Sequence, residues 1–248
     1  MSATDRAKVE EKVRKLLAQA ADRSTTSDEA ATFAARAAEL IARYDLDEAV
    51  IRAEAGEDPE GVGLLRFEVS GRGGHGRYRV QALAYIAGAY GCLVVSEGND
   101  SGPQDRTMLI VGTASALEAL KLLLPAFVLQ MEQAGARDAR RAVAHLRQGA
   151  RAAARRRFFR SFLVGWGWSV RERIKQARGQ IAEEVQGTTG ALVLVTDADR
   201  VRAEFQRRFS DVGKARSLGA LSSEGAQAGA AAGERADLGT GQLGSGGA

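Results

Sequence analysis

Residues 156–186 read RRFFRSFLVGWGWSVRERIKQARGQIAEEVQ and form the most regular hydrophobic pattern in the chain. Apolar residues recur every three or four positions, which is the spacing of one face of an α-helix. The segment therefore predicts a long helix with one buried stripe. The members of the stripe are Phe159, Phe162, Leu163, Trp166, Val170, Ile174, Ala177, Ile181 and Val185.

The segments around this helix predict a small sheet. Leu65, Phe67 and Val69 alternate with polar residues, which is the period of a half-buried strand. Apolar runs at 92–95 and 107–111 flank a polar loop and predict an antiparallel hairpin. Helical spacing predicts further helices between and after these strands, and a short strand is expected at 191–196. The fold class is therefore α+β: a helix-rich domain with a small, largely antiparallel sheet.

The ends of the chain differ from its middle. Two amphipathic segments, separated by a serine- and threonine-rich break, predict an N-terminal αα-hairpin. Near the other end, Gly225, Gly229 and Gly233 lie four apart, which suits a small-residue helix packed against a neighbour. We divide the chain into a hairpin domain at 1–53, a linker at 54–63, the α+β domain at 64–235 and a disordered glycine-rich tail at 236–248.

Three short motifs in the predicted hairpin support a resemblance. They are KVRKLLA at 12–18, DEA at 28–30 and YDL at 44–46. In these motifs the chain resembles the bacterial and phage family called domain of unknown function 2786. The resemblance implies a helical hairpin and a phage-related or bacterial setting, and it brings no activity.

The rest of the chain resembles the uncharacterised α+β domain that often follows this hairpin. The similar pieces are AYGC at 89–92, LIVG at 109–112, FFRSFLVGW at 158–166 and ADL at 236–238. This resemblance implies an architecture, and it supplies neither catalytic residues nor a cofactor.

Basic charge is concentrated in one part of the chain. Residues 137–178 hold thirteen Lys and Arg against two acids, Asp138 and Glu172, although the whole chain carries only +4. Guanidinium groups bind phosphates bidentately, and an exposed indole can stack on a base. The segment therefore predicts a non-enzymatic nucleic-acid-binding protein, with DNA or RNA as its partner. The predicted contact residues are Arg140, Arg141, Arg147, Arg151, Arg155, Arg156, Arg157, Arg160, Trp168, Arg171 and Lys175.

Other interpretations of the same residues stay open. The basic face can be a solvated surface, with Trp168 packed on another helix. The N-terminal hairpin can dock a protein partner, and an enzyme site can escape recognition. The nucleic-acid hypothesis requires Trp166 to be buried in the stripe, whereas Trp168 is more exposed, because residues two apart on a helix point in different directions.

Several further kinds of site are disfavoured. Residues 71–76 satisfy G-x-G-x-x-G, but the preceding strand is half exposed and the next strand leads to another strand, so a hinge loop is predicted instead of a dinucleotide site. His75 and His145 have no partners at metal-ligand spacing. The lone Cys92 is expected to be a buried structural thiol in a reducing compartment. We therefore expect no cofactor, no metal, no membrane span and a cytoplasmic location.

Overall fold

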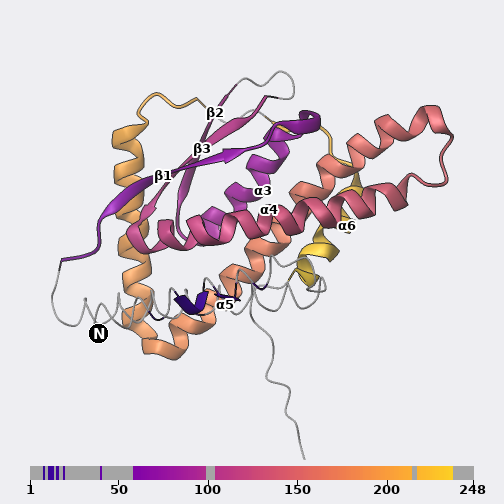
Figure 1. Cartoon of the computed structure of the whole chain (residues 1–248). Coiled ribbons are helices and arrows are strands. Elements are labelled where there is room, and N and C mark those ends of the chain that lie inside the picture. Colours follow the sequence, from indigo (N-terminus) through magenta and orange to yellow (C-terminus); the bar gives the residue numbers. More distant parts are fainter. Residues whose placement is uncertain are drawn as a thin grey trace, which may run out of the picture.

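A three-stranded antiparallel sheet forms the framework of the computed structural model, and helices pack against it (Figure 1). The strands are β1 (Val62–Val69), β2 (Leu93–Glu97) and β3 (Arg106–Thr113), in the order β1-β3-β2. The predicted α+β class and the antiparallel hairpin, which is β2 and β3, are confirmed. The structure describes residues 8, 11–13, 15, 16, 19, 40, 58–98, 104–213 and 217–236, and of residues 181–194 it describes the backbone alone.

One face of the sheet points into the core. Leu65 and Phe67 of β1 pack against the core to which Ile110 of β3 belongs, and the register pairs Leu65 with Ile110. On the other face, the guanidinium of Arg66 lies 3.3 Å from the carboxylate of Glu97. The alternation predicted for the first strand is therefore confirmed, because its apolar side chains face the core and its charged ones face outward.

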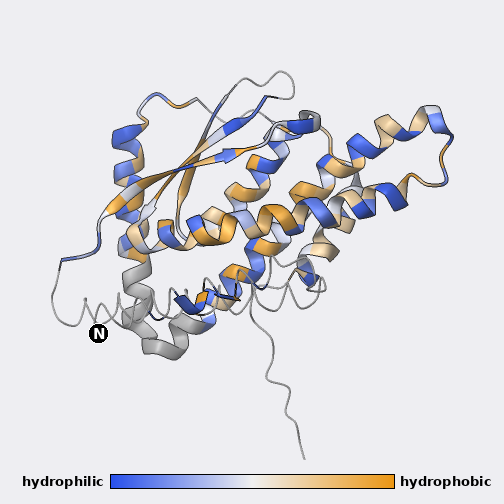
Figure 2. Ribbon diagram, in the orientation of Figure 1, coloured by the Kyte–Doolittle hydropathy of each residue, from blue (hydrophilic) through white to orange (hydrophobic). Residues whose placement is uncertain are grey.

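The helices pack in layers on the core face of the sheet. Helices α3 (Gly76–Ala89) and α4 (Ala114–Ala142) contact the strands, and α5 (Gln148–Arg208) packs on both of them. Helix α6 (Ser223–Arg235) lies along α5. Figure 2 shows apolar residues gathered where α4 and α5 meet the rest of the molecule, and more hydrophilic residues toward the turn between them.

Helix α5 contains the stripe that the sequence predicts. Phe162, Trp166 and Val170 are buried, and Trp166 is 1% exposed. The helix is much longer than predicted, because it begins at Gln148 and continues to Arg208. The strand expected at 191–196 is therefore wrong. A short apolar run fits a helix and a strand equally well, and neither edge strand of the described sheet pairs with it.

Helix α4 lies in the core. Among the described helices it alone is long and apolar enough to cross a membrane by length and composition. Leu120, Leu124 and Phe127 are nevertheless buried in the core cluster of the protein, whereas Leu129 is 44% exposed. Much of the apolar surface of α4 is thus used in packing within the molecule.

Helix α6 packs on α5 through glycines. A Cβ added to Gly229 would collide with the carbonyl oxygen of Phe162, and one added to Gly225 would lie 2.6 Å from that of Phe158. The close approach of two backbones therefore requires residues without side chains. The small-residue helix predicted from the four-residue glycine spacing is confirmed.

The N-terminal part of the chain contributes to the same core. Val13 is fully buried in the core cluster, and Leu16 and Leu40 pack against it. Most of the predicted hairpin lies outside the described residues, so the division into domains stays a prediction. Before β1, the carboxylate of Glu60 accepts hydrogen bonds from the backbone N and the Oγ of Ser115, at 2.8 and 2.6 Å.

Candidate functional site

Seven of the predicted contact residues lie around the turn between α4 and α5. This turn extends beyond the other described elements (Figure 1). All seven side chains are exposed, and none forms an ion pair with a described residue. The sequence explains this, because residues 139–171 contain no Asp or Glu. We call this group the arginine tip; it comprises Arg140, Arg141, Arg147, Arg151, Arg155, Arg156 and Arg157.

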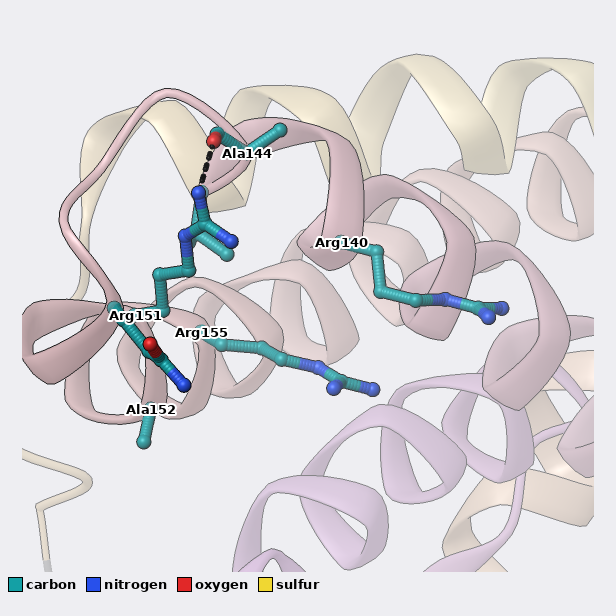
Figure 3. A pocket seen from close by; sticks show the side chains of 7 residues that line it. Arg140, Ala144, Arg151, Ala152 and Arg155 are labelled. Atoms are coloured by element: carbon teal, nitrogen blue, oxygen red, sulfur yellow. Dashed lines mark hydrogen bonds between the residues drawn. The ribbon is translucent and has the colours of Figure 1, made fainter.

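A hollow of about 440 Å³ lies between the two helices at the arginine tip (Figure 3). Three arginines contribute its charge, and its lining holds no carboxylate. Alanine and valine side chains supply an apolar part of the wall. The lining residues are Arg140, Val143, Ala144, Gln148, Arg151, Ala152 and Arg155.

The guanidinium groups of the three arginines in the hollow differ in their hydrogen-bond partners. Arg151 donates from Nε to the carbonyl of Leu146 at 2.7 Å and from Nη2 to that of Ala144 at 2.8 Å, so it holds the turn. Among the described residues, the guanidinium of Arg140 has one hydrogen-bond partner, the carbonyl of Ala136, to which its Nε donates. The guanidinium of Arg155 has no hydrogen bond to any described residue. Figure 3 shows Arg140 and Arg155 extending in the same direction.

Exposed arginines at the far end of α5 are neutralised by acids on the same helix. Arg202 pairs with Asp199 at 3.4 Å, and Arg207 pairs with Glu204 at 2.6 Å. These pairs have the spacing at which opposite charges support a helix. In the arginine tip, by contrast, the residue four positions from Arg151 is another arginine, Arg155, and like charges at this spacing destabilise a helix.

The start of α5 adds to the positive potential. Its N-cap is Arg147, no side chain caps the free N–H groups, and the first turn holds no acid. The N-terminus of a helix carries a partial positive charge, so arginines here repel it and anions are attracted. Both the side chains and the backbone at this turn therefore favour a negatively charged ligand.

The other predicted contact residues lie further along α5. Trp168 is thirteen residues beyond Arg155, which at 1.5 Å per residue is roughly 20 Å along the helix. Trp168 is 48% exposed, so the predicted contrast with the buried Trp166 is confirmed. The guanidinium of Arg171 lies over the indole at 4.5 Å, and Tyr85 meets it edge-on at 5.4 Å. A base that stacks on the face beneath Arg171 must displace this cation.

The face predicted to join these two groups is interrupted. Ser161 and Val164, which lie between Arg157 and Trp168 along α5, are both buried. The backbone N of Ser222, just before α6, donates to the Oγ of Ser161 at 2.8 Å. The predicted contact residues are therefore separated into the arginine tip and a distant group around Trp168. Lys175 is exposed within the distant group.

Arg160 turns away from both groups toward the glycine loop. Its Nε donates to the Nδ1 of His75 and its Nη2 to the carbonyl of Gly74, each at 3.4 Å. Its guanidinium also lies over the ring of Tyr78 at 5.3 Å. Arg160 therefore joins α5 to the loop at residues 71–76, a role that the sequence pattern did not indicate.

The glycine loop is held in place by side chains. Arg79 donates from Nη1 to the carbonyls of Ser70 and Arg72, both at 2.8 Å, and Gly71 N donates to the carboxylate of Asp105 at 2.7 Å. These bonds hold the loop in the arrangement seen here, and the predicted hinge stays a prediction. The preceding strand β1 pairs antiparallel with β3, whereas a dinucleotide fold requires parallel neighbours. The motif is thus a structural turn.

Burial shifts the pKa values of His75 and Cys92, the histidine of the glycine loop and the single cysteine. Burial, aided by the nearby charges of Arg79 and Arg160, lowers the pKa of His75 from 6.5 to about 4. Burial also raises the pKa of Cys92 to about 12, so its thiol stays protonated at neutral pH, as expected of a structural cysteine. Within the described part of the chain, no three His, Cys, Asp or Glu side chains are grouped as metal ligands.

Comparison with known proteins concerns the N-terminal part alone. Residues 8–48 match the model of a family described as "Protein of unknown function (DUF2786)". No curated protein and no solved structure matches the chain significantly. The matched segment ends before β1, so the arginine tip lies outside it. The N-terminal segment is therefore similar to this family of unknown function, as its short motifs predict.

Proposed function

We propose that this protein is a non-enzymatic nucleic-acid-binding accessory protein that contacts phosphates with the arginine tip. The observation that carries the proposal is the absence of any ion pair between these seven exposed arginines and the described residues. At the far end of the same helix, Arg200 and Arg207 are paired with acids. The contrast indicates that the missing negative charge comes from a ligand.

A polyanion suits this surface better than a single small anion does. Like charges at helical spacing and a positive helix end each destabilise the free protein by tenths of a kcal/mol. A nucleic acid offers phosphates at regular short intervals, so several arginines are neutralised at once and bound counterions are released. A cytoplasmic, bacterial or phage setting, in which nucleic acid is accessible and thiols stay reduced, agrees with this role.

A salt titration tests the proposal. The chain should bind single-stranded or duplex nucleic acid at low salt, with an affinity that falls steeply as salt rises. Replacing Arg155 and Arg156 with Gln should lower the slope of log K against log salt by roughly 1.4–1.8, or 0.7–0.9 for each lost phosphate contact. Fluorescence anisotropy with labelled oligonucleotides measures this slope.

A matched control separates the arginine tip from general charge. Arg202 and Arg207 are also exposed arginines of α5, but they pair with Asp199 and Glu204. Replacing both with Gln removes the same charge and should leave the slope nearly unchanged. Equal losses in the two double variants would contradict a site at the arginine tip. If no nucleic acid binds at low salt, the proposal is wrong, and a protein partner of the N-terminal hairpin becomes the leading hypothesis, with an unrecognised enzyme site behind it.

A further inference from the structure

We infer that the hollow between α4 and α5 takes one phosphomonoester group carried by a nucleotide, such as the phosphate at the end of a nucleic-acid strand. This inference rests on the proposed function, because it names the part of a nucleic acid that enters the hollow. It follows from how the lining arginines are engaged and from the size and polarity of the hollow.

The positive charge of the hollow and its two open guanidinium groups favour such a group. Arg151 is committed to the carbonyls of Ala144 and Leu146, which closes the turn side of the hollow. Arg140 and Arg155 reach in from different helices and extend in the same direction (Figure 3). The three lining arginines together carry +3, because the carbonyl partners of Arg151 are neutral. A phosphomonoester, with three acceptor oxygens and a charge of about −1.5 to −2 at neutral pH, neutralises more of this charge than a phosphate inside a strand, which carries about −1.

The volume and the wall of the hollow favour a phosphate with its nucleoside attached. Sites for small ligands have volumes of roughly 300–1,000 Å³, and this hollow has about 440 Å³. A phosphate alone fills a small part of such a volume. The buried Val143 and the methyl groups of Ala144 and Ala152 form an apolar wall against which a sugar and base can lie.

Oligonucleotides that differ only at one end test the inference. A single strand of about ten nucleotides, a length within one typical site, is compared with a 5′-phosphate and with a 5′-hydroxyl at the same salt concentration. The phosphorylated strand should bind roughly tenfold more tightly, as expected for charge-assisted hydrogen bonds. Competition by a 5′-mononucleotide then identifies the source of the group. If the mononucleotide competes weakly, the hollow takes the ends of strands. If it competes as strongly as the phosphorylated strand, the hollow takes free nucleotides. Both results agree with a phosphomonoester site when the phosphorylated strand is preferred over the hydroxyl strand.

Variants of the two available arginines locate the effect. Arg140→Gln and Arg155→Gln should each reduce the preference for the phosphorylated strand, so that the two strands bind with nearly equal affinity. Arg155→Lys keeps the charge but loses the two-pronged geometry, so it should reduce this preference while keeping the salt slope. Arg202→Gln, at the far end of α5, should leave the preference unchanged.

Two results would overturn the inference while leaving nucleic-acid binding intact. One is equal binding of the phosphorylated and hydroxyl strands by the unaltered protein. The other is a preference that survives in both Arg140→Gln and Arg155→Gln, which would place the end-specific site elsewhere. Failure of every strand to bind at low salt would instead refute the proposed function, and this inference would fall with it.

Discussion

His75 illustrates how a single buried residue connects three elements. It is 8% exposed, precedes α3, and accepts a hydrogen bond from Arg160 of α5 on its Nδ1. Because Nδ1 accepts this bond, the proton of the neutral ring lies on Nε2. The ring also contacts Phe159 at 5.0 Å between centroids. Burial disfavours a charge on this ring, and such a charge would also lie beside the guanidinium groups of Arg79 and Arg160, so the neutral form is favoured.

This environment predicts a pH dependence of stability. The unfolded chain takes up a proton on His75 near pH 6.5, whereas the folded protein does so only near pH 4. Protons therefore bind preferentially to the unfolded state between these values, and the free energy of unfolding should fall as the pH drops from 6.5 to 4, by about 1–3 kcal/mol. Urea unfolding at pH 7 and pH 4.5 measures the change.

The variant His75→Gln provides the control, because glutamine does not titrate. The variant keeps the other side chains around this position, including the ion pair between Glu132 and Arg79, so any contribution of theirs to acid sensitivity is common to both proteins. The loss of stability should therefore be smaller in the variant. An equal loss in both proteins would show that His75 is not the group responsible.

At the level of elements, the contact between α5 and α6 depends on the absence of side chains. A Cβ on Gly229 would collide with the backbone of Phe162, which cannot rotate away. Gly229→Ala should therefore push α6 from α5 and destabilise the protein by about 1–3 kcal/mol, although alanine favours a helix more than glycine does. Thermal unfolding followed by circular dichroism measures this effect.

Gly179 is the matched position for this substitution. It lies within α5, and nothing stands within 4 Å of a Cβ added there. Gly179→Ala should stabilise the protein by roughly 0.5–1 kcal/mol, because only the helix propensity changes. Stabilisation by both substitutions would refute the requirement for close backbone packing between α5 and α6.

At the level of the whole molecule, the relation between the N-terminal part and the rest can be tested by proteolysis. Asp58 and Pro59 are exposed and precede β1 without regular structure, so a protease should cut the predicted linker at 54–63. Val13 is buried in the core cluster, so the two pieces should stay together after the cut. Gel filtration followed by mass spectrometry identifies the associated pieces.

The outcome distinguishes two organisations of the chain. Pieces that separate without unfolding the larger one would show that residues 1–53 form an independent domain. A linker that resists cleavage under mild conditions would contradict its predicted exposure. Cleavage with retained association is the expected result, since the apolar contact of Val13 does not depend on the exposed peptide bonds near Asp58.

Local patterns predicted much of the fold. The stripe around Trp166 and the alternation of Leu65 and Phe67 were visible because side-chain burial follows the period of each element. The boundaries of α5 were missed, because Arg147 is an unusual N-cap and because the apolar run at 191–196 has no period that separates a strand from a helix.

By itself, the sequence determined the α+β class, the antiparallel hairpin and the concentration of arginines without acids, since each depends on neighbouring residues. Only the tertiary structure decided which of these residues are available to a ligand. Ser161 is covered by Ser222, which is 61 positions away, and Arg160 is drawn to a loop 85 positions earlier. Such contacts depend on how distant segments pack, and this packing cannot be predicted from local periodicity.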